Sequence, residues 1–163
     1  MVGVLWSAEG LGSETPEPSY GPAPEPLSGA DLPSFRYALG SIKTETFAGG
    51  TAKEANVTGF PVSDELAGVY MTLEPGALRE LHWHANAAEW AYVIEGRCRV
   101  TTIDPDNQAE IADFAAGDVW YFPRGHGHSI QGIGPGTCTF ILVLDNGYFS
   151  EFGTFSISIR TRS

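Results

Sequence analysis

From Phe35 onward, short hydrophobic and β-branched runs alternate with clusters of turn-forming residues. Two such clusters are Asp104-Pro105-Asp106-Asn107 and Asp145-Asn146-Gly147, both typical of chain reversals. No run keeps a helical period, so we expect little helix. Short strands at regular spacing predict an all-β sandwich or barrel. The predicted strands are 69–73, 90–94, 98–103, 109–114, 119–122, 129–131 and 137–144.

The N-terminal part has a different composition. Six of the 11 prolines lie between Glu14 and Pro33, separated by Gly, Ser and acidic residues. Such a segment stays extended. We therefore expect an extended arm over residues 1–34, one folded domain over 35–155 and a short tail over 156–163. Composition leaves open whether the arm is free or packs on a neighbouring subunit.

Charge and length narrow the possible partners. The chain has 163 residues, 42% of them hydrophobic, which suits one domain with its own core. Its net charge of −11 argues against nucleic acid and against an anionic membrane surface. No apolar run approaches the ~20 residues that span a bilayer. Residues 1–10 lack a charged region followed by an apolar one, which favours a cytoplasmic location.

The two cysteines, Cys98 and Cys138, each lie inside an apolar run. Neither belongs to a Cys-x-x-Cys pattern, which argues against a thiolate metal site. We expect both to be buried free thiols, and a disulfide or a reactive site is the alternative.

Four side chains from two stretches form a candidate metal site. His82 and His84 are two residues apart, so a strand would place both imidazoles on one face. Glu89 follows a polar kink, and His128 adds a third imidazole. Three histidines and one carboxylate suit a divalent first-row metal with open positions, whereas a structural zinc site would be closed. Two glycines flank His126, which we interpret as a loop residue.

The same residues resemble the two motifs of the cupin superfamily. The first motif, G-x5-H-x-H-x4-E-x6-G, is matched in full, and the second, G-x5-P-x-G-x2-H-x3-N, departs at its last position, Gly132. The resemblance implies a double-stranded β-helix, or jelly-roll barrel, that holds the metal. The matching residues are Gly76, His82, His84, Glu89 and Gly96, then Gly117, Pro123, Gly125 and His128.

Longer stretches resemble the oxalate decarboxylase family, in particular its amino-terminal cupin. They are Arg79–His84, Ala88–Val93 and Asp118–Gly125, and the resemblance runs from about Phe35 to Phe155. It implies Mn²⁺, with Fe²⁺ or another divalent metal as the alternative. It also implies dioxygen as a cofactor and oxalate as the substrate.

The resemblance also implies roles for two further residues. Arg79 falls at the family's substrate-binding arginine, whose planar fork suits a carboxylate. Glu151 falls at the acid of a lid of pattern S-E-x-S-T, matched here by residues 150–154, in which Gly153 is expected to loosen the lid. An acid there favours decarboxylation to formate and CO2. The alternatives are an oxalate oxidase that yields CO2 and peroxide, and a non-catalytic metal-binding cupin.

Two departures from that family bear on these expectations. Its members carry two cupins in one chain, whereas this sequence has one and ends soon after Phe155. An inactive, truncated product is therefore one interpretation. A lone cupin resembles the germin arrangement, in which cupins pair, so we expect a homo-oligomer, either a dimer or a hexamer.

Overall fold

The computed structural model describes residues 33–153 and 157–159. Almost all of the predicted arm lies outside the described residues. Thr154 of the predicted lid also lies outside them. The predicted tail, 156–163, contains one described strand, β12.

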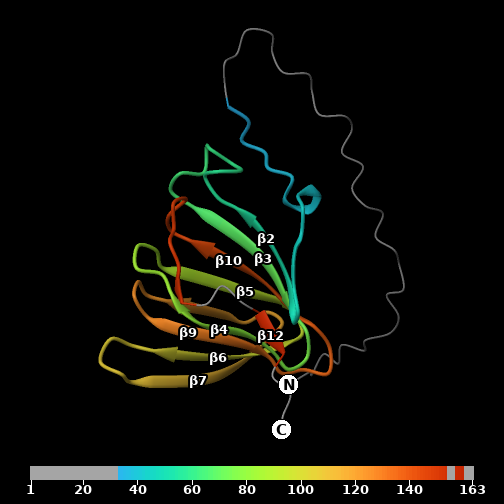
Figure 1. Cartoon of the computed structure of the whole chain (residues 1–163), viewed down its shortest axis with the longest axis vertical. Helices are drawn as coiled ribbons and strands as arrows, with labels where there is room; N and C mark the ends of the chain where they lie inside the picture. Colours follow the sequence, from blue (N-terminus) through green and yellow to red (C-terminus); the bar gives the residue numbers. More distant parts are fainter. Residues whose placement is uncertain (1–32, 154–156, 160–163) are drawn as a thin grey trace, which may run out of the picture. The chain divides into compact units, whose positions relative to one another are not determined.

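The domain consists of two antiparallel sheets packed face to face (Figure 1). Sheet A runs in the order β1 (Glu45–Phe47), β2 (Gly50–Ala55), β3 (Ala67–Leu73), β10 (Cys138–Leu144), β5 (Glu89–Glu95) and β8 (Val119–Phe122). Sheet B runs in the order β11 (Phe152–Gly153), β4 (Ala77–Trp83), β9 (Gly127–Gly132), β6 (Arg97–Ile103) and β7 (Ala109–Ala115), and β12 (Ile157–Ile159) also pairs with β4.

This architecture confirms the predicted all-β, jelly-roll class. In the part of the chain that the structure describes, helix is limited to the 3-10 turn η1 (Leu39–Ser41). No helix in this part is long and apolar enough to cross a membrane.

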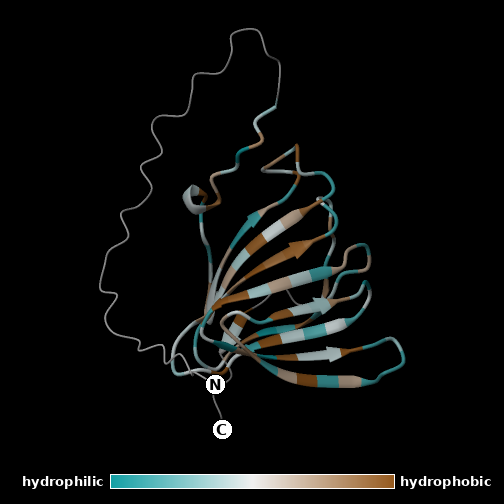
Figure 2. Cartoon of the chain, turned by 180° about the vertical axis from the view of Figure 1, so that it is seen from behind, coloured by the Kyte–Doolittle hydropathy of each residue, from teal (hydrophilic) through white to brown (hydrophobic). Residues whose placement is uncertain are grey.

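The core lies between the sheets and is built by alternation along the strands. In β10, Phe140, Leu142 and Leu144 are buried against sheet B. The residues between them, Ile141 and Val143, are apolar too, so this strand is hydrophobic along most of its length (Figure 2). Strands with this pattern are usually covered on both faces.

The glycines of the two cupin motifs occupy turns that require a left-handed backbone. Gly76, Gly96, Gly117 and Gly125 have φ values of 79°, 78°, 96° and 77°. Residues with a Cβ rarely adopt these angles. At Gly96 a Cβ would also lie 2.2 Å from the carbonyl oxygen of Thr137, so only glycine fits.

The expectation of free thiols is wrong. Cys98 in β6 and Cys138 in β10 form a disulfide that joins sheet B to sheet A, with Cα atoms 6.0 Å apart. Both residues are fully buried, as expected. The pairing depends on two strands from different sheets that face each other across the core, and their cysteines are 40 residues apart in sequence. No local pattern carries that information.

Candidate metal centre

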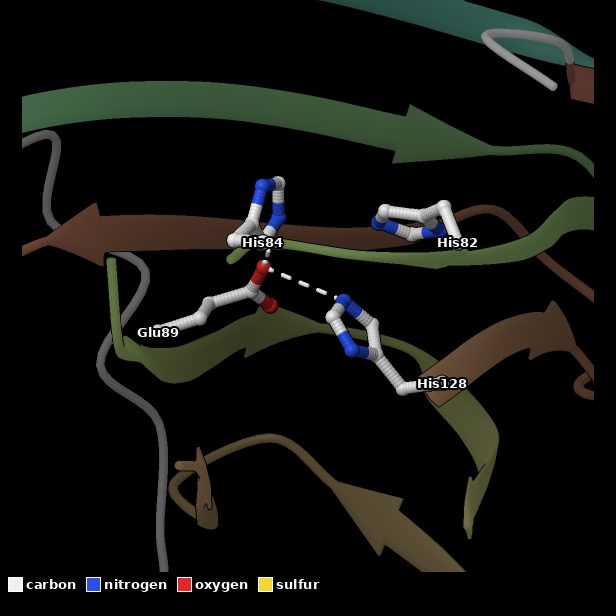
Figure 3. A group of neighbouring side chains, drawn as sticks. All are labelled: His82, His84, Glu89 and His128. Carbon is white, nitrogen blue, oxygen red and sulfur yellow. Dashed lines mark ion pairs between the residues drawn. The ribbon is translucent and has the colours of Figure 1, made fainter. Parts of the chain in front are cut away.

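Both sheets contribute to one cluster of four buried side chains. His82 lies near the end of β4 and pairs in register with His128 of β9, and His84 follows directly after β4. Glu89 comes from the opposite sheet, at the start of β5. One ligand atom from each of the four lies within 4.8 Å of all the others. Each residue is at most 5% exposed, and the four point toward one another (Figure 3).

Hydrogen bonds at the far side of each ring orient the three imidazoles. The Nδ1 atom of every ring lies within hydrogen-bond distance of a backbone carbonyl oxygen, which can only accept. Nδ1 therefore carries the proton, and Nε2 presents its lone pair to the cluster. The acceptors are the carbonyl oxygens of Glu80 for His82 (2.7 Å), Ser150 for His84 (3.2 Å) and His126 for His128 (3.0 Å).

The Glu89 carboxylate has Trp120 on one side and two of the histidines on the other. Its Oε1 accepts a hydrogen bond from the indole Nε1 of buried Trp120 at 3.3 Å. Its Oε2 lies 3.3 Å from His84 Nε2 and 3.4 Å from His128 Nε2 (Figure 3). Among the described residues, neither Glu89 Oε2 nor His128 Nε2 has a hydrogen-bond partner. Buried lone pairs that converge without a donor between them are satisfied by a cation.

The buried environment keeps these groups in the protonation states that a metal needs. Burial, and to a smaller extent the neighbouring His128 and Arg79, lowers the pKa of His82 to about 2. Burial by itself would raise the pKa of Glu89, but His128 and His84 outweigh it, and the pKa of this carboxyl lies below its usual range. His82 is therefore neutral and Glu89 ionised at neutral pH, as metal coordination requires.

Aromatic side chains fix the positions of two ligands. The ring of Phe122 stacks on His128 with centroids 4.0 Å apart, and Phe149 contacts His84 edge-on at 5.6 Å. Beside the cluster is a cavity of about 20 Å³, which is room for about one water molecule. Its polar lining consists of His82, His84, Glu89, Arg79 and Glu151.

Arg79 and Glu151 meet at this cavity. The Arg79 guanidinium donates through Nη2 to Glu151 Oε1, and the pair forms a salt bridge. Arg79 is 3% exposed and Glu151 is 15% exposed. The fold thus brings together all six residues that the sequence analysis selected for the site. His126 lies in the turn before β9 and is not a member of the cluster.

The segment that carries Glu151 is fastened to the loop between β4 and β5. The side-chain amide of Asn86 donates to the Tyr148 carbonyl oxygen. Its oxygen accepts two hydrogen bonds from Ser150, one from the backbone N–H and one from the hydroxyl. Neither Asn86 nor Trp120 was predicted from the sequence as part of the site. Both are polar partners contributed by other elements, and neither has a sequence signature of its own.

The structure gives Gly153 a packing role, while a loosening of the segment by this glycine stays a prediction. Gly153 pairs with His82 in the β11–β4 ladder, and its φ is 123°. A Cβ at this position would lie 2.7 Å from the Leu81 carbonyl oxygen and 2.9 Å from His82 Cα. The glycine therefore lets β11 approach β4 closely, directly behind a ligand of the candidate metal centre.

Residues 39–160 match the family model described as Cupin. Oxalate decarboxylase OxdC of Bacillus subtilis is 45% identical over 125 residues, which are 77% of this chain and 32% of that protein. An oxalate decarboxylase of Arthroderma benhamiae is 34% identical over 122 residues, or 75% of this chain and 28% of that protein. Germin-like protein 1-1 of Oryza sativa is 34% identical over 106 residues, or 63% of this chain and 49% of that protein.

Solved structures agree with these sequence matches. The structure of oxalate decarboxylase from Bacillus subtilis at pH 4.6 superposes with a TM-score of 0.71 at 43% identity, covering 76% of this chain and 32% of that one. A structure solved to assign the Mn(II) centres of the same enzyme gives a TM-score of 0.70 at 43% identity, covering 74% and 32%. The chain thus spans about a third of the length of the oxalate decarboxylases it matches. By its family match, its two-sheet fold and its sequence similarity, the chain belongs to the cupin family.

Proposed function

We propose that His82, His84, Glu89 and His128 bind one divalent first-row metal ion, with manganese as the preferred ion. The converging Nε2 lone pairs and the unpaired Glu89 Oε2 support this assignment. Three neutral imidazoles and one carboxylate would leave a divalent ion with a net charge of about +1. This donor set suits Mn²⁺ or Fe²⁺ and leaves positions for substrate. The Mn(II) centres of the similar Bacillus subtilis enzyme favour manganese.

We propose oxalate as the substrate and decarboxylation to formate and CO2 as the reaction. The observation that carries this proposal is the ion pair between Arg79 and Glu151 at the cavity beside the metal cluster. This ion pair combines the buried, planar guanidinium of Arg79, which suits a substrate carboxylate, with the Glu151 carboxyl group, which can transfer a proton. The relatives named as oxalate decarboxylases agree with this chemistry.

The size of the cavity requires the Glu151 segment to open. About 20 Å³ holds about one water, whereas oxalate has six non-hydrogen atoms. When the segment moves, the Arg79 guanidinium gives up the Glu151 carboxylate and can take a substrate carboxylate in exchange. Closure around the substrate would then exclude water from the site.

Glu151 would supply the proton that completes the reaction. A bound manganese ion would supply Lewis acidity and redox chemistry, and dioxygen remains part of this proposal as a cofactor. Monoprotonated oxalate loses CO2 as its C–C bond breaks, and a C–H bond forms at the remaining carbon. Glu151 takes up the acidic proton of monoprotonated oxalate and delivers it to this carbon, so the products are formate and CO2 with no net oxidation.

Oxalate oxidation is the second candidate, because the same metal ligands and Arg79 would bind the same substrate. It differs in outcome, since without protonation the second carbon is oxidised as well and dioxygen is reduced to peroxide. A third candidate is a non-catalytic metal-binding cupin, because the four ligands by themselves would hold an ion without any reaction.

One experiment separates the three candidates. Purified protein is analysed for bound metal and then assayed with oxalate for formate and peroxide side by side. We expect bound manganese, with formate and CO2 in near-equal amounts. In Glu151→Gln we expect formate formation to fall by about 10²- to 10⁴-fold while metal content is unchanged. Glu110→Gln, an exposed carboxylate on β7, is the matched control. Unchanged formate in Glu151→Gln would refute the assigned acid, peroxide as the product would favour oxidation, and neither product would favour the non-catalytic candidate.

A further inference from the structure

The cavity beside the metal cluster is lined by two chemically different surfaces. Most of its polar lining comes from β4 of sheet B and from the Glu151 segment. Across the gap between the sheets, β3 and β10 of sheet A contribute apolar side chains. Four of these side chains, each at most 7% exposed, are Val69, Met71, Leu142 and Leu144. We call these four residues the apolar wall.

The apolar wall belongs to the fixed part of the site. β10 is paired with β3 on one side and with β5 on the other (Figure 1), so its backbone groups are hydrogen-bonded within the sheet. Glu151, in contrast, lies just before β11, a strand of two residues at the edge of sheet B. Opening of the Glu151 segment would therefore admit a ligand while the apolar wall stays where it is.

Leu142 is the residue that tests the size of the apolar wall most cleanly. Its neighbours in the ladder are Val69 in β3 and Ala91 in β5, both of them smaller side chains. Leu142 therefore provides most of the bulk in this row. Leu144 is less suitable, because it pairs in register with Glu89 and a change there would disturb a candidate metal ligand.

We propose that the apolar wall, with Leu142 as its main determinant of size, restricts this site to flat dicarboxylates whose two carboxyl groups are bonded directly to each other. The inference rests on the proposed function, because it takes Arg79 and the metal as the groups that hold the two ends of the substrate. The middle of such a ligand faces sheet A. Oxalate presents only a flat face there, whereas malonate would place a methylene group against the apolar wall.

Both size and polarity make the apolar wall selective. One methylene group more or less in a close-fitting apolar pocket changes binding about 10- to 200-fold. A hydroxyl or amide on a middle carbon would bind more weakly still. It would leave water, and the four side chains of the wall offer it no hydrogen-bond donor. The apolar wall thus disfavours longer dicarboxylates and substituted ones.

Calorimetric titration of the manganese-loaded full chain with oxalate and with malonate tests this inference. Dioxygen is excluded, so that binding is measured without the proposed reaction. We expect the wild type to bind oxalate at least tenfold more tightly than malonate. In Leu142→Ala this ratio should fall about tenfold or more, because a void beside a central strand closes only in part and admits the methylene group. Leu142→Val, which keeps a strand-forming side chain, should give an intermediate ratio and replaces the alanine variant if that variant does not fold.

Ile141→Ala is the matched control. Ile141 precedes Leu142 in β10 and is half-buried on the opposite face of the sheet, so its truncation should leave the ratio unchanged. Metal analysis of every sample verifies that the ion is present. A metal-loaded wild type that binds neither dicarboxylate would overturn the proposed substrate together with this inference. The inference alone is overturned if oxalate binds but the ratio is the same in both Leu142 variants, or if the wild type binds malonate as tightly as oxalate.

Discussion

The guanidinium of Arg79, in β4, and the carboxylate of Glu151, just before β11, form a salt bridge in the lining of the cavity beside the metal cluster. The two residues are 72 positions apart in sequence. Arg79 is buried and Glu151 is partly exposed, so the carboxylate is the partner that can leave. A substrate carboxylate would therefore replace Glu151 on the arginine, while the arginine stays in place.

Arg79→Lys should therefore weaken substrate binding more than metal binding. A lysine keeps the charge but loses the planar fork that holds a carboxylate through two hydrogen bonds. We expect kcat/KM for oxalate to fall by about 10- to 100-fold, since one charge-assisted hydrogen bond accounts for about 1.5–3 kcal/mol. Steady-state kinetics and metal analysis on the same sample provide the measurement. An equal loss of metal would show that the effect is structural.

His128 and His126 provide a matched pair for the metal assignment. His128→Ala removes a ligand and should abolish stoichiometric metal binding, because the site loses the ring nitrogen that faces Glu89 Oε2. His126→Ala keeps the backbone carbonyl that orients His128 and should keep the metal. Elemental analysis after dialysis distinguishes them. Equal metal content in the two variants would contradict the assignment.

Trp120→Phe should loosen the Glu89 carboxylate without removing a ligand. The indole N–H is the donor to Glu89 Oε1, and phenylalanine keeps much of the packing but not the donor. Loss of such an outer partner typically lowers metal affinity about 10- to 100-fold. Competition with a chelator of known affinity measures this change. An unchanged dissociation constant would mean that the 3.3 Å contact does not position the carboxylate.

The stability of the metal-free protein should fall in acid. The pKa of His82 is about 2 in the folded chain against an ordinary 6.5, so between these values the unfolded chain binds a proton that the folded chain does not. Unfolding free energy therefore decreases as pH drops through this range, by up to ~1.4 kcal/mol per pH unit from this group. The lowered pKa of Glu89 acts in the same direction below pH 4.5. Denaturant titrations of protein stripped of metal by a chelator measure the unfolding free energy at each pH. This free energy should depend less steeply on pH in His82→Gln than in the wild type, and an identical dependence would exclude His82 as the cause.

Removal of the disulfide should destabilise the domain. The Cys98–Cys138 bond closes a 40-residue separation and joins the two sheets, so its loss is expected to cost about 2–4 kcal/mol of unfolding free energy. Denaturant unfolding of the double alanine variant measures this loss.

Thiol titration of unfolded wild-type protein should detect free cysteines only after reduction. Because disulfides persist mainly in oxidising compartments, thiols that are free on isolation would favour the cytoplasmic location instead.

The sequence by itself determined the parts of this protein that depend on local order. Alternation and turn residues located seven of the strands within about two residues, because side-chain period and backbone preference are properties of neighbouring residues. Five strands, β1, β2, β4, β11 and β12, were not among the predicted ones, although the spacing of His82 and His84 already suited a strand at the end of β4. Thr51, Lys53 and Glu54 give β2 a polar sequence, and its place in sheet A comes from pairing with β3.

The spacing of His82, His84, Glu89 and His128 was sufficient to select them as one candidate cluster. The tertiary structure decided which atoms face one another. Glu89 belongs to sheet A, His82 and His128 belong to sheet B, and His84 directly follows β4 of sheet B, so only the packing of the sheets brings the four together. The same packing pairs Cys98 with Cys138 and brings Trp120 to Glu89. Contacts between sheets follow from long-range burial of apolar surface, which no local sequence window encodes.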